Sequence, residues 1–136
     1  SVIEPGNWGR MLRTYDLRDP NQHWRPLREL IFEVVRSKYF PLLPSRLTAL
    51  FACETEADLQ KFMNDRRSDI GYEIELLDPA QSIHRGCLDK VAFPNNSPVP
   101  VLQEYFENQA KSYWSGTGIS SPEIVTLSSA RIIRRI

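Results

Sequence analysis

The stretch PLLPSRLTALFACETEADL, residues 41–59, carries the pattern on which the predicted fold depends. Apolar side chains fill much of the run from Arg46 to Cys53, which follows two prolines, and this composition predicts a short strand at the centre of a sheet. Thr55 precedes Asp58 by three residues, a spacing that resembles a capping box with aspartate in place of glutamate. We therefore expect a central strand that is followed directly by a helix.

A longer helix is predicted before this strand. Pro26 suits its first turn, and the helix must end before Pro41, because a proline disfavours helical geometry in the residue that precedes it. Further upstream, the run from Met11 to Tyr15 is short and extended, and we take it as the first strand. Apolar residues recur at intervals of three and four along the helix, and the face that we expect in the core consists of Trp24, Leu27, Leu30, Ile31, Val34 and Val35.

The second half of the chain adds further strands and another helix. Tyr72, Ile74 and Leu76 alternate with glutamates, which predicts a half-exposed strand. The other expected elements are a strand over 87–93, a helix over 101–113, and two strands over 123–127 and 130–136 that form a hairpin. Early helices followed by a largely late sheet favour an α+β fold.

Composition limits the classes of protein to which the chain can belong. Its 136 residues are enough for one domain over 1–136 and too few for two. The 17 basic and 17 acidic residues cancel, so no overall charge attracts nucleic acid or a membrane surface. The sequence has neither an apolar run of membrane-spanning length nor a signal-peptide pattern. We therefore expect a soluble, cytoplasmic protein.

Several kinds of reactive site are not indicated by the sequence. Cys53 and Cys87 lie in apolar runs without a further cysteine or histidine at metal-ligand spacing, so we expect buried thiols and no metal site. His23 and His84 lack partners at the spacing of a hydrolase triad. The six glycines are scattered and do not form a phosphate-binding loop of the Walker or Rossmann kind.

Three polar features remain once the strands are placed. They are Arg13 on the first expected strand, the Ser45, Arg46 and Thr48 entry to the central strand, and Glu123 after the glycine-rich loop YWSGTGISS. This arrangement resembles the Arg-Ser-Glu layout of mono-ADP-ribosyltransferases, and in particular the small bacterial domains of toxin and phage-defence systems. The resemblance covers most of the chain as an order of elements. It implies a mixed-sheet core with two to three flanking helices around an NAD cleft.

The resemblance also implies a role for each of these residues. Glu123 would be the catalytic carboxylate that stabilises an oxocarbenium-like transition state when the bond between nicotinamide and ribose breaks. Arg13, with Arg46 as the alternative, would bind the NAD pyrophosphate through its planar fork of donors. Ser45 or Thr48 would bond the glutamate or the nicotinamide ribose. The aromatic faces available to nicotinamide or to an acceptor base would be those of Tyr113 and Trp114.

The acceptor of the ADP-ribosyl group is left open by the sequence. Arginine-modifying members of the family carry a second acid two residues before the catalytic glutamate, where this chain has Ser121. This departure argues against an arginine acceptor and leaves nucleic-acid bases, hydroxyls and other side chains open. The resemblance also implies an intracellular target, and an antitoxin or immunity protein as a partner. The alternatives are an NAD glycohydrolase, and a non-catalytic module that binds a protein or RNA through the basic strand RIIRRI.

Each chosen residue also has a purely structural explanation. Arg13 can pair with Asp16 or Asp19 on the surface, Ser45 can shape a turn, and Thr48 suits a strand because it is β-branched. Aromatic residues at a helix end, such as Tyr113 and Trp114, belong to a core more often than to a ligand site.

Overall fold

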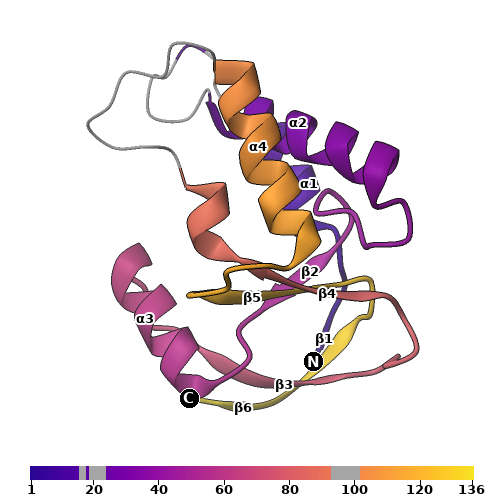
Figure 1. Ribbon diagram of the computed structural model, residues 1–136. Coiled ribbons are helices and arrows are strands. Elements are labelled where there is room, and N and C mark those ends of the chain that lie inside the picture. The colour runs from indigo at the N-terminus through magenta and orange to yellow at the C-terminus, as the bar shows by residue number, and fades with distance from the viewer. Residues whose placement is uncertain (16–17, 19–23, 93–101) are drawn as a thin grey trace.

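The computed structural model describes residues 1–15, 18, 24–92 and 102–136, which form an α+β fold with two small antiparallel sheets (Figure 1). None of its described helices is long and apolar enough to cross a membrane. In chain order the elements are β1 (Val2–Ile3), α1 (Asn7–Leu12), α2 (Trp24–Tyr39), β2 (Leu50–Ala52), α3 (Glu56–Arg66), β3 (Tyr72–Leu76), β4 (Ile83–Cys87), the 3₁₀ helix η1 (Leu88–Val91), α4 (Leu102–Ser115), β5 (Pro122–Thr126) and β6 (Ala130–Arg135).

The two sheets have the strand orders β2-β5-β4 and β1-β6-β3. In the first sheet Phe51 of β2 lies opposite Val125 of β5, so β5 is the central strand and β2 is at an edge. The prediction of a central strand over 46–53 was therefore wrong in both length and position. Residues 46–48 form a turn, which leaves three residues for β2 at the edge, whereas the five residues of β5 pair with two neighbours.

The predicted hairpin between the last two strands was also wrong, because β5 and β6 belong to different sheets. Residues 127–129 carry the chain from one sheet to the other. Ser128 fixes this passage: its N–H donates to Thr126 Oγ1 at 3.1 Å, and its Oγ accepts from the N–H of Asp78 at 2.9 Å. The N–H of Leu77 donates to the Ser129 carbonyl at 3.0 Å, so β6 continues next to β3 instead of folding back on β5.

The core lies between the first sheet and the helices α2 and α4, which lie side by side in Figure 1. Phe32 of α2 packs on Tyr113 of α4 with ring centroids 5.5 Å apart, and the indole N–H of Trp114 donates to the Phe32 carbonyl at 2.9 Å. Val125 of β5 is fully buried beneath them. The helix end that precedes β5 is thus anchored both by packing and by a hydrogen bond.

The face of α2 that enters the core differs from the predicted one. Leu30 and Val34 are 61% and 62% exposed, and Leu27 is exposed as well. Of the predicted face, Val35 is buried and Trp24 and Ile31 are half-buried. The other buried residues of α2 are Arg28, Glu29 and Phe32. The search for apolar residues at intervals of three and four gave the wrong face because it treats every charged residue as a surface residue. Here two charged residues belong to the buried face.

The predicted strand from Met11 to Tyr15 was wrong, because α1 and the turn after it occupy this region. Gly6 begins the helix with a φ of 96°, and its N–H donates to the Ala49 carbonyl at 3.0 Å. Gly9 lies so close to the next segment that an added Cβ would be 1.9 Å from the Leu47 carbonyl oxygen. The two glycines let α1 lie against residues 47–49. The strand prediction looked only for extended apolar patterns, so it did not take these glycines into account.

Other expectations were confirmed. The helix after Thr55 begins as predicted, with Thr55 Oγ1 accepting from the Asp58 N–H at 3.1 Å. The helix from Trp24, the strand from Tyr72 and the helix before Tyr113 are also present. The strand expected over 87–93 was wrong, since β4 ends at Cys87 and a 3₁₀ helix follows. Its last residue, Phe93, and the predicted helix start at Val101 lie outside the described residues.

Candidate active site

Two of the predicted site residues meet in the interior of the molecule. Arg46 lies in the turn before β2, and Glu123 is the second residue of β5. Arg46 Nη1 donates to Glu123 Oε2 at 2.5 Å, although 77 residues separate them in the sequence. Arg46 is 5% exposed and Glu123 is 7% exposed. The structure thus places an early guanidinium and the late carboxylate in direct contact.

Tyr113 of α4 completes the contact from a third element. Its hydroxyl donates to the same Glu123 oxygen, Oε2, at 2.7 Å, and it accepts from Arg46 Nη1 at 2.8 Å. Burial raises the pKa of Tyr113 well above its usual value, and the attraction of Arg46 does not reverse this, so the phenol keeps the proton that it donates. Gly86 of β4 makes room for the ring, because a Cβ there would lie 2.3 Å from a Tyr113 ring carbon.

A second carboxylate, Glu29 of α2, lies behind this contact. Both of its oxygens accept from Arg46 Nε at 3.1 Å, and Oε1 also accepts from the indole N–H of Trp8 at 2.9 Å and from Arg28 Nη2 at 2.8 Å. Arg28, Glu29, Arg46 and Glu123 form what we call the buried charge cluster, in which two positive and two negative charges balance.

Electrostatics keeps Glu29 and Arg46 ionised. Burial alone would raise the pKa of Glu29, but the charges of Arg46 and Arg28 lower it to about 2. Burial likewise works to lower the pKa of Arg46, and the charges of Glu123 and Glu29 outweigh it and hold the pKa above its usual value. Ion pairs in the interior persist only when several bonds offset the desolvation of both ions, and this cluster supplies them.

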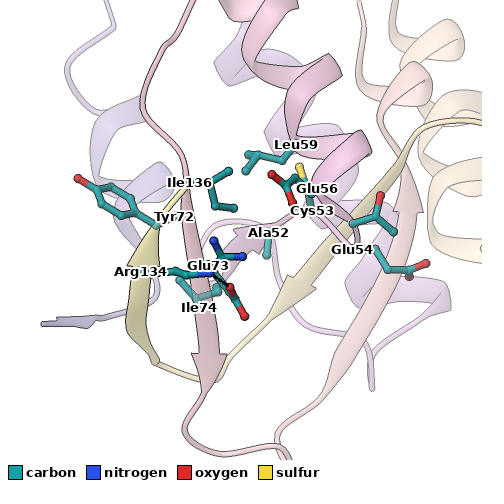
Figure 2. A pocket seen from close by; sticks show the side chains of 11 residues that line it. Ala52, Cys53, Glu54, Glu56, Leu59, Tyr72, Glu73, Ile74, Arg134 and Ile136 are labelled. Atoms are coloured by element: carbon teal, nitrogen blue, oxygen red, sulfur yellow. Dashed lines mark hydrogen bonds and ion pairs between the residues drawn. The ribbon is translucent and has the colours of Figure 1, made fainter.

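Glu123 and Arg46 also form part of the wall of a groove. A hollow of about 210 Å³ adjoins them, and a smaller one of about 130 Å³ shares Glu123 with it and extends toward Cys53. A third hollow of about 380 Å³, shown in Figure 2, shares Ala52, Cys53 and Leu59 with the second and reaches the other sheet. The residues that line the first hollow are Trp8, Arg25, Arg28, Arg46, Phe51, Phe62, Arg66, Leu88, Val91 and Glu123.

One atom of each charged partner is left for a ligand. Among the described residues, none donates a hydrogen bond to Glu123 Oε1 and none accepts one from Arg46 Nη2. Neither atom is completely buried, and both residues line the first hollow. Glu123 is therefore held in place through Oε2, while its other oxygen, Oε1, stays accessible.

Comparison with known families places this site in a wider group of proteins. Residues 8–133 match the family described as "Protein of unknown function (DUF2441)". The chain belongs to this family. Among curated proteins, none is similar enough in sequence to count as a match. The DUF2441 match begins at Trp8, the donor to Glu29, and it includes every residue that lines the first hollow.

Arg13 and the two small hydroxyl residues lie elsewhere in the DUF2441 fold. Arg13 and Thr48 line a separate hollow beside α1, which shares no residue with the one at Glu123. Asp16 and Asp19, the predicted alternative partners of Arg13, lie outside the described residues. Ser45 Oγ donates to Glu33 Oε2 at 2.7 Å. The hydroxyl that bonds Glu123 is that of Tyr113, rather than that of Ser45 or Thr48.

The two aromatic residues predicted to stack on a ligand are core residues. Tyr113 is fully buried and Trp114 almost so, and their rings pack at 4.9 Å against each other and at about 5 Å against the His84 ring. His84 Nε2 lies 2.9 Å from the Tyr113 carbonyl, which can only accept, so this nitrogen carries the proton. Neither Tyr113 nor Trp114 lines the groove.

Apart from Arg46 and Glu123, sequence reasoning considered only Arg66 among the residues that line the groove, as a local attraction for phosphates together with Arg67, and it missed the others. Phe62 and Arg66 are one helical turn apart on α3, and the Arg66 guanidinium carbon lies 5.1 Å from the Phe62 ring centroid. A signal for Arg28 was present, since Trp24, Arg28, Phe32 and Val35 have helical spacing and three of them are apolar.

Ser121, two residues before Glu123, accepts from Lys61 Nζ at 2.8 Å. Within the described residues, no group of three or more ligand side chains could hold a metal ion.

Proposed function

We propose that the protein is an NAD-dependent ADP-ribosyltransferase in which Glu123 is the catalytic carboxylate. The observation that carries the proposal is the contact between Glu123 and Arg46 in the wall of a groove, with one carboxylate oxygen fixed and the other accessible. A role as a toxin or anti-phage effector with an intracellular target belongs to the same proposal.

The lining of the groove suits a ligand that carries both phosphates and flat rings. Four guanidiniums and one carboxylate line the first hollow, and this charge balance favours an anion. Arginine donates to phosphate oxygens through a planar fork, and Arg66 lines this hollow. The rings of Phe51 and Phe62 line this groove and offer apolar contact to a nicotinamide or adenine ring.

The chemistry that we propose requires little movement of Glu123. Its accessible Oε1 would accept a hydrogen bond from the 2′-hydroxyl of the nicotinamide ribose, and its charge would stabilise the developing oxocarbenium ion. The bond from ribose C1′ to the nicotinamide nitrogen breaks, and nicotinamide leaves with the electron pair. The acceptor nucleophile then forms a bond to C1′ and gives up its proton to the carboxylate or to water.

The competing binding module is less well supported. In β6, Arg131 pairs with Glu75 at 3.6 Å and Arg134 pairs with Glu73 at 2.5 Å. These glutamates on β3 offset much of the positive charge that would attract RNA to the last strand. An NAD glycohydrolase would use the same groove with water as acceptor, and the assay below separates it from a transferase.

The test uses NAD labelled in its adenine-containing half, incubated with the purified full chain and a cell lysate. We expect release of nicotinamide and transfer of label to material that is sensitive to nuclease or to protease. Glu123→Gln should lower the rate at least 100-fold, whereas Glu75→Gln, which removes an exposed carboxylate on the other sheet, should leave it unchanged. Release without transfer would indicate a glycohydrolase. Neither release nor transfer by the unaltered chain would refute the proposal.

A further inference from the structure

Glu29 occupies the centre of the buried charge cluster without lining the groove. Its side chain is 1% exposed, and it is absent from the lining of every hollow at Glu123. Removing a carboxylate from water costs several kcal/mol, so a charged residue on the buried face of a helix requires hydrogen bonds and opposite charges that offset this cost. Its three donors, Trp8, Arg28 and Arg46, come from α1, α2 and the turn before β2.

The orientation of Arg46 depends on this second carboxylate. The Phe51 and Tyr113 ring centroids lie 4.8 and 5.1 Å from its guanidinium carbon and limit the tilt of the guanidinium plane. Contact with a ring face does not prevent rotation within that plane. Two anchor points prevent it: Nη1 bonds to Glu123 and Tyr113, and Nε bonds to Glu29.

We infer that Glu29 is a positioning residue for Glu123 and acts through Arg46, in the NAD cleavage proposed above, on which this inference rests. With Nε held by Glu29, Nη1 remains on Glu123 Oε2 and leaves Oε1 accessible. Without Glu29 the cluster carries an excess positive charge, and Arg46 loses one of its two anchors. Among the described residues, Glu123 is then the one carboxylate left to Arg46 and Arg28, and it moves toward them and away from the reacting ribose.

The experiment compares two substitutions on the same helix. Glu29→Gln removes the inner anchor, and Glu33→Gln removes a carboxylate one turn later that pairs with Arg36 at 2.7 Å and has no bond to Arg46. We expect Glu29→Gln to lower the kcat for nicotinamide release about 100-fold with KM within twofold, because misplacement of a reacting group by about 1 Å can have this effect. Glu33→Gln should change neither constant by more than about twofold.

A second variant guards against loss of folding. Glu29→Asp keeps the charge but shortens the side chain by one methylene, and we expect its kcat to fall about tenfold while its circular dichroism spectrum stays that of the folded chain. A rise in KM at constant kcat in the Glu29 variants, or equal losses in the Glu29 and Glu33 variants, would overturn the inference.

A measurement without NAD separates this inference from the proposed function. Nuclear magnetic resonance of the ligand-free chain follows the Arg46 Nε–H signal and the carboxylate carbon of Glu123. Both should shift in Glu29→Gln and stay in place in Glu33→Gln. If the unaltered chain releases no nicotinamide, the proposed function fails, and these shifts still decide whether Glu29 positions Glu123. An unmoved Glu123 signal in Glu29→Gln would overturn the positioning role.

Discussion

Arginine–glutamate pairs occur in two regions of this molecule, and the regions use them differently. In the buried charge cluster, each arginine bonds to Glu29 and Arg46 bonds to Glu123 as well, with tyrosine and tryptophan as further donors. Between β3 and β6, Glu73 and Glu75 each face one arginine across the strand pair, and all four side chains are exposed. The same residue types therefore build a rigid interior site in one place and a solvated strand surface in the other.

Removal of one arginine from each region should give the largest contrast. Arg46→Met leaves Glu29 and Glu123 buried with fewer partners, and we expect the free energy of unfolding to fall by about 3–5 kcal/mol. Arg134→Met removes an exposed pair and should lower it by less than about 1 kcal/mol. Urea denaturation followed by circular dichroism measures both. Similar losses for the two variants would mean that burial does not distinguish the regions.

Acid should separate the regions through Glu29. Its pKa of about 2 in the folded chain lies below the ordinary value of 4.5, so the folded state is stabilised while Glu29 is ionised. This contribution is complete above pH 4.5 and is lost as the pH falls from 4.5 toward 2, and its size is about 3 kcal/mol. Unfolding curves at several pH values should show a slope that Glu29→Gln reduces and Glu75→Gln retains. An equal slope in both variants would contradict the assignment of this pH dependence to Glu29.

Salt should have the smallest effect, and it should act only on the exposed pairs. Raising the ionic strength to about 1 M shortens the screening length to about 3 Å and weakens solvated pairs. The double variant Glu73→Gln, Glu75→Gln should cost less than about 1 kcal/mol at low salt, and this cost should vanish at high salt. The cost of Arg46→Met should persist at both ionic strengths. The measurement is the shift in the urea midpoint, and a salt-dependent loss in Arg46→Met would indicate that water reaches the cluster.

Local signals in the sequence predicted much of the secondary structure. The hydroxyl of Thr55 and the proline positions mark helix ends because they act on nearby backbone groups, and the helix starts at Trp24 and after Thr55 were confirmed. The hairpin of the last two strands could not be corrected from the sequence, because Ser128 acts through a contact with Asp78, 50 residues away.

The candidate site was predicted only in part. Arg46 and Glu123 were among the chosen residues, and the structure brings them together, but Arg13 was placed by a predicted strand where the structure has the end of α1 and a turn. Arg28 and Glu29 were missed because their charges cancel inside the protein, and a hydropathy pattern scores each residue alone. Compensation between charges that meet only after folding leaves no local trace in the sequence.

The separation of 77 residues between Arg46 and Glu123 has a consequence for the order of folding. Closing a flexible loop of that length costs about 4 kcal/mol in chain entropy, beyond a constant term. A solvated ion pair contributes less than about 1 kcal/mol and cannot hold such a loop closed. We therefore expect packing of α2 and α4 on β5 to bring the two segments together first, and the bridge between Arg46 and Glu123 to form late in folding.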